Sequence, residues 1–230
     1  MIFVTGGTGL VGSHILMRLT LENKKFKAVK RSTSSTSICK KVFKFYNLHD
    51  KFLKINWVEG DINDIPFLEE EISGCNLIIH AAAMVSYNPR EMNIMNKVNI
   101  EGTANIVNVA LDSNIKKIAY ISSIATLSRE KKSKIINESN YFENTGSESN
   151  YAISKYYAEQ EVWRASAEGI DVVIINPSVI LGPGDWSKGS SQLFAKSYNG
   201  LNFFTEGITG FVDVLDVSKI TIELLFSEIV

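Results

Sequence analysis

The first twelve residues constrain the fold most, because they set a strand, a glycine turn and a helix in that order. Ile2–Val4 is a short apolar run that predicts a buried strand. Gly6, Gly9 and Gly12 interrupt it, and from Leu10 the apolar residues recur at helical spacing. Backbone N–H groups and the positive end of a helix dipole then meet at one point, which suits a pyrophosphate. The alternative is a glycine-rich turn that holds no ligand.

The three glycines each have a separate role in this interpretation. Gly6 would permit the tight turn, and Gly9 would let the backbone approach a phosphate without a Cβ. Gly12 would let the helix lie close to the strand.

Composition narrows the class of protein. The chain has 230 residues, 45% of them hydrophobic, and a net charge of −1, which favours a globular α/β protein and argues against nucleic acid or an anionic membrane as a partner. No apolar run approaches the ~20 residues that cross a bilayer, and we expect no signal peptide at the N-terminus. Cys39 and Cys75 lie in no metal-binding or redox spacing, so we expect no metal, free thiols and a cytoplasmic location.

Apolar runs alternate with helical patterns along the rest of the chain. Strands are expected at residues 26–30, 54–58, 77–83, 117–121, 171–175 and 211–215, and helices at 39–48, 65–72, 88–113, 151–168 and 217–229. Within the helical region 88–113, the inward residues are expected to be Ile94, Val98, Ile106, Val107 and Leu111. The alternation predicts a doubly wound, parallel α/β sheet of the Rossmann type.

Two less regular segments complete the predicted organisation. Residues 129–143 are polar and charged and predict an exposed loop, and residues 182–210 suggest a lid or a substrate-facing segment. We therefore expect a dinucleotide-binding domain over residues 1–176. A small substrate lobe would follow over 177–230, with its last strand and helix returning to the main domain.

The end of the second expected strand bears on the choice of dinucleotide. An acidic residue there would bind the ribose 2′-hydroxyl of NAD(H). This chain instead has Lys30, Arg31 and Ser32, and two cations with a hydroxyl suit a 2′-phosphate. The sequence therefore favours NADP(H) and leaves NAD(H) possible. The alternative is a solvated basic strand end.

Other strand ends carry polar or small residues. Asp61 could accept a hydrogen bond from an adenine amino group, or it could cap the helix at 65–72. Ala81, Ala82 and Ala83 would leave room for a ligand at the carboxyl edge of the sheet. His80 is interpreted as a packed, hydrogen-bonded histidine in preference to a base.

Three further polar sites suggest chemistry. Asn99 in the helical region must satisfy its amide, as a clamp to the neighbouring strand or as part of a proton relay. Ser122 and Ser123 follow the fifth expected strand. Tyr151 and Lys155 lie one turn apart on one helix face, and the alternative for them is an ordinary surface pair.

Taken together, these motifs resemble the extended short-chain dehydrogenase/reductases, also called the NAD-dependent epimerase/dehydratase family. Lys30-Arg31 and the stretch that begins Tyr120-Ile-Ser-Ser are similar to the dihydroflavonol reductase and 3β-hydroxysteroid dehydrogenase branches. The match covers essentially the whole chain through the following positions: residues 5–12, Asp61, Asn99, Ser122, Ser123, Tyr151, Lys155 and residues 176–183.

The resemblance implies a role for each matching residue. Tyr151 would be the general acid/base, Lys155 would bind the nicotinamide ribose, and Ser123 would bind the substrate oxygen, with Ser122 as the alternative. Asn99 would support this catalytic set. The cofactor would contact Gly6, Thr8, Gly9, Leu10, Val11, Gly12, Lys30, Arg31, Ser32, Asp61, Ile62, Ala81, Ala82, Ala83, Tyr151, Lys155 and Pro177.

The implied activity is NADP(H)-dependent reduction of an aldehyde or ketone, with a small-molecule carbonyl or alcohol as the partner. The alternatives are a nucleotide-sugar epimerase or dehydratase with tightly bound NAD(P), and a non-catalytic NADP-sensing protein. Relatives usually continue well past the strand at 211–215, so we expect a truncated or reduced substrate lobe. A homodimer formed through the helices that carry Asn99 and Tyr151 is a further expectation.

Overall fold

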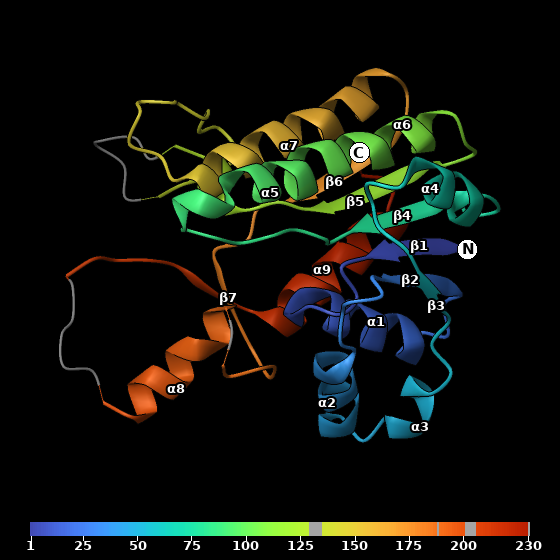
Figure 1. Ribbon diagram of the computed structural model, residues 1–230, viewed down its shortest axis with the longest axis horizontal. Helices are drawn as coiled ribbons and strands as arrows, with labels where there is room; N and C mark the ends of the chain where they lie inside the picture. The colour runs from blue at the N-terminus through green and yellow to red at the C-terminus, as the bar shows by residue number, and fades with distance from the viewer. Residues whose placement is uncertain (129–134, 188, 201–205, 230) are drawn as a thin grey trace.

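The computed structural model describes residues 1–128, 135–187, 189–200 and 206–229, and its centre is a parallel sheet between two helical layers (Figure 1). The sheet has six strands in the order β3-β2-β1-β4-β5-β6. Their bounds are β1 Ile2–Thr5, β2 Phe26–Lys30, β3 Trp57–Glu59, β4 Leu77–His80, β5 Lys117–Ile121 and β6 Asp171–Ile175. The strand order reverses between β1 and β4, and such a switch point leaves a crevice at the carboxyl edge. The predicted doubly wound α/β fold is confirmed.

Each face of the sheet is covered because successive strand residues point to opposite sides. Phe3 packs in a core with Ile78, Ile118 and Val172, whereas Ile2 and Val4 pack in a second core on the other face. The layer over the first core consists of α4 Ile65–Ile72, α5 Met92–Asn96, α6 Gly102–Leu111 and α7 Asn150–Ala167. The opposite layer consists of α1 Leu10–Leu21, α2 Ser37–Phe45, α3 His49–Phe52 and α9 Val214–Phe226.

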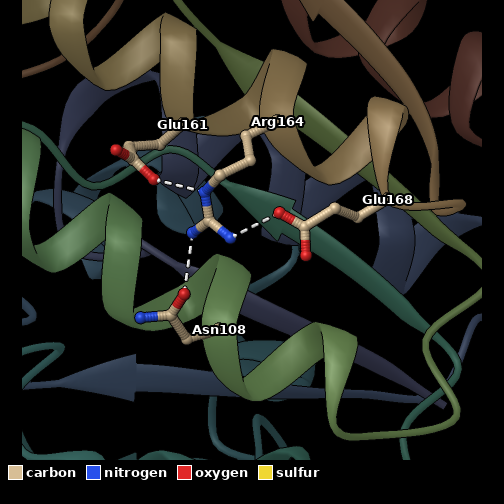
Figure 2. A network of polar contacts seen from close by, with 4 residues as sticks. All are labelled: Asn108, Glu161, Arg164 and Glu168. Atoms are coloured by element: carbon tan, nitrogen blue, oxygen red, sulfur yellow. Dashed lines mark hydrogen bonds and ion pairs between the residues drawn. The ribbon is translucent and has the colours of Figure 1, made fainter.

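The side chain of Arg164 joins α6 to α7 at the outer surface through three polar contacts (Figure 2). The Arg164 guanidinium donates to Glu161 at 2.9 Å and to Glu168 at 3.0 Å, both on or just after α7. It also donates at 2.7 Å to the amide oxygen of Asn108 on α6. These groups are partly exposed, so each contact contributes no more than about 1 kcal/mol.

The chain between β6 and α9 builds a small structure beside the main sheet (Figure 1). Strands β7 Val179–Leu181 and β8 Phe211–Asp213 pair in parallel, and α8 Gln192–Tyr198 lies between them in sequence. The carboxylate of Asp213 accepts from the Leu215 amide at 2.7 Å, and this cap begins α9 at Val214. The final helix therefore starts three residues earlier than predicted.

Several element boundaries differ from the sequence-based expectations. The strand predicted at 54–58 occupies Trp57–Glu59, and the helix predicted at 39–48 is α2, Ser37–Phe45. The region 88–113 is divided into a 3-10 turn Pro89–Glu91, α5, a π-helical turn Lys97–Glu101 and α6. Neither β7 nor α8 was predicted. Of the expected loop 129–143, residues 129–134 lie outside the described part, and 135–143 form no helix or strand.

The expectation that Ile94 faces inward is wrong. Its side chain is 60% exposed and lines a cavity at the carboxyl edge of the sheet. The division of the helical region by the π-helical turn breaks the single periodicity from which the inward face was predicted.

Within the described ranges, none of the helices combines the length and the apolar character that crossing a bilayer requires.

Candidate active site

The N-terminal turn adopts a backbone that only glycine fits at two positions. Gly6 has φ +72°, and a Cβ there would lie 2.5 Å from the Ala81 carbonyl. A Cβ on Gly12 would lie 2.1 Å from the Gly6 oxygen, so α1 can approach the strand only without a side chain at this position. Gly9 is the N-cap of α1 and offers no side-chain cap. The first N–H groups of this helix therefore have no capping side chain at the cavities described next.

Cavity A, of about 300 Å³, lies along the carboxyl ends of β1, β2 and β4. It includes ten of the residues predicted to bind the cofactor: Gly6, Thr8, Gly9, Lys30, Arg31, Asp61, Ile62, Ala81, Ala82 and Ala83. Ser34 lines the cavity, whereas Ser32 does not and is exposed. The sequence offered no spacing that would separate these two serines within the run from Ser32 to Ser37.

The two cations at the end of β2 have different surroundings. Lys30 forms an ion pair with Glu59, its neighbour in register on β3. Arg31 is exposed, and its Nε lies 3.5 Å from the Ser34 hydroxyl. Since Lys30 already has an acidic partner, Arg31 is the better candidate for a phosphate at the mouth of cavity A.

Asp61 does not cap the helix that follows it. Its carboxylate accepts from the Asn63 backbone at 2.9 Å and from the Asn63 amide at 3.0 Å. The N-cap of α4 is Asp64, which accepts from the Phe67 amide at 3.3 Å. Asp61 instead lines cavity A, and its contact with adenine stays a prediction.

Cavity B, of about 310 Å³, adjoins cavity A and shares Gly6, Gly9, Ala81 and Ala83 with it. Its wall includes Ile121 at the end of β5 and further residues singled out from the sequence, namely Leu10, Val11, Gly12, Ser122, Tyr151 and Lys155. Segment 180–191 supplies another part of the wall through Ile180, Asp185, Gly189, Ser190 and Ser191. The two cavities together form one elongated groove over the topological switch point.

Tyr151 lines cavity B, and Ser123 is close enough to its phenol to influence its pKa but lines neither cavity. Ser149 caps α7 by accepting from the Ala152 amide at 3.1 Å, and this places Tyr151 in the first turn. Ser122 lines cavity B, but its hydroxyl donates to the buried Glu159 carboxylate at 2.5 Å. Of the two serines, Ser123 is therefore the one whose hydroxyl is not given to Glu159.

Burial raises the pKa of the Tyr151 phenol, and the nearby Ser123 hydroxyl partly opposes that rise. The Lys155 ammonium donates to the Tyr120 hydroxyl at 2.5 Å and to the Ile121 carbonyl at 2.9 Å. Burial lowers the pKa of Lys155 to about 7, and the nearby charge of Glu159 opposes this shift. The phenol is therefore protonated at neutral pH in the protein alone.

Glu159 is a buried carboxylate that the sequence analysis missed. It accepts from Ser122 at 2.5 Å, Thr126 at 2.9 Å and Asn176 at 2.9 Å, and so joins the carboxyl ends of β5 and β6. Residue 159 follows Tyr151 and Lys155 by multiples of four, which puts all three on one helix face. A charged residue on that face was the signal that could have found it.

The remaining predicted residues lie behind the groove. The Asn99 amide accepts from the Met84 N–H at 2.7 Å and donates to the Met84 carbonyl and to Ser154. This is the clamp alternative, with both ends of the amide engaged and no part in lining either cavity. Pro177 lines neither cavity; its carbonyl accepts from the Ile124 amide at 3.0 Å.

Two other sequence-based points concern buried groups. His80 is hydrogen-bonded to Thr5 and Thr103, and burial lowers its pKa to about 3, as suits a packed neutral histidine. Cys39 and Cys75 are buried free thiols, and burial raises the pKa of both, that of Cys39 to about 12. Over the described residues, no group of three His, Cys, Asp or Glu side chains is placed to hold a metal ion.

Comparisons with known proteins show relatives of this chain. A putative dihydroflavonol 4-reductase of Synechocystis is 34% identical over 183 residues, which are 80% of this chain and 50% of that protein. The UDP-glucose 4-epimerase of Vibrio cholerae is 29% identical over 195 residues, 80% of this chain and 52% of the epimerase. The crystal structure of gox2253 superposes with a TM-score of 0.84 at 27% identity, over 98% of this chain and 66% of gox2253.

The chain spans about half the length of the curated relatives it matches. The profile of the NAD dependent epimerase/dehydratase family matches residues 2–213, nearly the whole described fold. The chain therefore belongs to the NAD-dependent epimerase/dehydratase family, the extended short-chain dehydrogenase/reductases.

Proposed function

We propose that this chain binds a nicotinamide dinucleotide along cavities A and B and catalyses reduction of an aldehyde or ketone to an alcohol. The observation that carries the proposal is the position of Tyr151 and Lys155 in the wall of cavity B, with Ser123 near the Tyr151 phenol. A proton donor and a buried cation thus lie at one end of a groove, with a hydroxyl beside the donor. The other end of the groove is cavity A, whose lining residues include Arg31 and Asp61 and suit a nucleotide.

The groove suits a dinucleotide for reasons of shape and charge. Gly9 lines both cavities, and a Cβ there would meet nothing nearer than the Gly6 oxygen at 3.5 Å, so it would project into the groove. The uncapped first turn of α1 offers N–H groups to a pyrophosphate at this point. Asp61 and Arg31 would lie toward the adenosine end, and Tyr151 and Lys155 toward the nicotinamide end.

The dinucleotide, when bound, supplies the hydride. The protein supplies the proton, and the raised pKa of Tyr151 suits a donor because the phenol is protonated at neutral pH. Ser123 would hold the substrate oxygen as negative charge develops on it. Lys155, protonated, would favour the phenolate that remains after proton transfer.

We further propose a preference for NADP(H), carried by Arg31. Replacing Arg31 with alanine should weaken binding of NADPH roughly 10- to 100-fold, since a charge-assisted hydrogen bond contributes about 1.5–3 kcal/mol. Binding of NADH should change little, because it lacks the 2′-phosphate. Fluorescence titration of both dinucleotides measures the difference.

Lys30→Ala is the matched control for this prediction. The two cations are adjacent, but Lys30 is paired with Glu59, so its removal should weaken NADPH binding less than the removal of Arg31. Equal losses of NADPH and NADH in Arg31→Ala would reject the contact with the 2′-phosphate.

The activity itself is tested by a cofactor-oxidation screen of the chain, and of a longer natural form if one exists, against aldehydes, ketones and nucleotide sugars. Net loss of NADPH absorbance with an aldehyde or ketone is the expected result. Interconversion of a nucleotide sugar without net oxidation would favour the epimerase alternative, to which the similarity with the Vibrio cholerae epimerase lends support. Tight binding with no turnover on the whole panel would favour a sensing protein.

A further inference from the structure

Lys155 is fully buried, and its ammonium donates hydrogen bonds to neutral oxygen atoms. Its Nζ donates to the Tyr120 hydroxyl at 2.5 Å and to the Ile121 carbonyl at 2.9 Å. The Tyr120 ring also lies under the ammonium, 4.1 Å from its centroid. Among the residues that the structure describes, no carboxylate is within ion-pair distance of Lys155. The Tyr120 hydroxyl is thus one of the two acceptors that stabilise the charged form.

The Tyr120 oxygen accepts from Lys155, because an ammonium donates and has no lone pair. The Thr103 hydroxyl is close enough to the Tyr120 phenol to influence its pKa. It donates to the Asn99 carbonyl at 2.6 Å, so its single proton is committed and its oxygen is left as an acceptor for the phenol hydrogen.

His80 fixes this arrangement from the other side. Its Nε2 lies 2.9 Å from the Thr103 hydroxyl oxygen, and its Nδ1 lies 2.6 Å from the Thr5 hydroxyl. The neutral imidazole donates from Nε2 and accepts at Nδ1, a tautomer that satisfies every member of the chain. The His80 ring also stacks on the Tyr120 ring with centroids 5.4 Å apart, so both the ring and the hydroxyl of Tyr120 have fixed contacts.

We propose that Tyr120 is the positioning residue for Lys155, and that its hydroxyl holds the lysine as an ammonium at the wall of cavity B. This inference rests on the proposed function for the purpose that it assigns to Lys155. Burial of Tyr120 raises the pKa of its phenol, so the phenol stays neutral and acts as an acceptor over the working range of pH. No motif in the sequence marked this residue for such a role.

The other groups that face Lys155 leave its pKa near neutral pH, where the loss of one acceptor can be measured. Glu159 lies one turn farther along α7 and favours the ammonium, whereas burial opposes it, and the resulting pKa is about 7. Tyr151 and His80 face the lysine as neutral groups. Near neutral pH the lysine is close to half protonated, so the loss of one acceptor changes the fraction that carries charge.

The test is an NMR titration of ¹³C-labelled lysine side chains in the wild type and in Tyr120→Phe. The phenylalanine keeps the ring under the ammonium and removes only the acceptor oxygen. The pKa of Lys155 should fall by about one unit, a tenfold change in the ratio of amine to ammonium, because hydrogen bonding to the charged form is lost. In the reductive assay, the decline of kcat/KM on the alkaline side should move to lower pH by a similar amount.

Tyr156→Phe is the matched control, because Tyr156 is adjacent to Lys155 in the chain but stacks on Phe142 at 4.2 Å. It should leave the pKa of Lys155 where it is. If Tyr120→Phe does not fold, Thr103→Val provides the second test. This variant removes the acceptor that orients the phenol hydrogen, and the pKa of Lys155 should again fall.

An unchanged or raised pKa of Lys155 in Tyr120→Phe, or in Thr103→Val where that variant replaces it, overturns the inference. The titration needs no substrate, so its result does not depend on whether the chain reduces a carbonyl. Failure of the proposed function would appear as an absence of turnover in the wild type, which is a separate observation.

Discussion

Replacing Tyr151 with phenylalanine should lower the rate of carbonyl reduction by about a thousandfold, while binding of NADPH stays within about twofold. The phenol is the group placed to give a proton to the substrate oxygen, and a general acid contributes about 10²–10⁴ in rate. The phenyl ring keeps the contact with Tyr87, whose ring centroid lies 6.3 Å away. Single-turnover oxidation of NADPH and fluorescence titration separate the two quantities.

Tyr157→Phe serves as the control on the same helix. The Tyr157 side chain is exposed, so both the rate and the binding should be unchanged. Reduction that persists at more than a tenth of the wild-type rate in Tyr151→Phe would show that another group donates the proton. A parallel loss of NADPH binding would point to a collapsed groove in place of a missing acid.

Glu159→Ala should reduce the free energy of unfolding by about 3 kcal/mol or more. The carboxylate accepts hydrogen bonds from Ser122, Thr126 and Asn176, and a hydrogen bond to a charged group contributes about 1.5–3 kcal/mol. For a chain of this size, that loss lowers the melting temperature by roughly 6–12 °C. Thermal and urea unfolding measure it directly.

Glu161→Ala is the matched comparison, because it removes a glutamate from the same helix at a position where the carboxylate pairs with the partly exposed Arg164 (Figure 2). Its cost should be below about 1 kcal/mol. If the two variants lose the same stability, Glu159 does not hold the ends of β5 and β6 together. Glu159→Gln should fall between them, since the three donors share one carboxylate oxygen that an amide oxygen can replace, but without the negative charge.

The fold was largely predictable because its signals are local. The glycine turn, the apolar strands and the order of elements each follow from a few adjacent residues. The incorrect predictions lie where contacts between residues far apart in the sequence determine the structure. Residues 54–58 were predicted as a strand from their apolar content, but β3 pairs with β2 only from Trp57 onward. Ile94 has the spacing of a core residue and nevertheless lines cavity A.

The candidate site likewise has parts that could be predicted from the sequence and parts that could not. The positions of Gly6, Gly12 and Tyr151 follow from motifs, so the sequence located the glycine turn and the end of the groove at cavity B. The pairing of Lys30 with Glu59 depends on strand register, and the contact of Lys155 with Tyr120 joins residues that are 35 positions apart. A single sequence carries no local signal for either pairing, and both change how the charges at the groove are interpreted.

The π-helical turn at Lys97–Glu101 has a consequence for how such chains tolerate changes in length. It accommodates one residue more than an α-helical turn, and α5 and α6 on its two sides both pack on α7. Deleting one residue within the turn would restore an α-helical turn and leave α5 and α6 in their present relation to α7. Deleting one residue inside α5 or α6 would instead rotate part of that helix by about 100°. In natural variants, a single-residue gap in this helical region should therefore fall at the turn and not within α5 or α6.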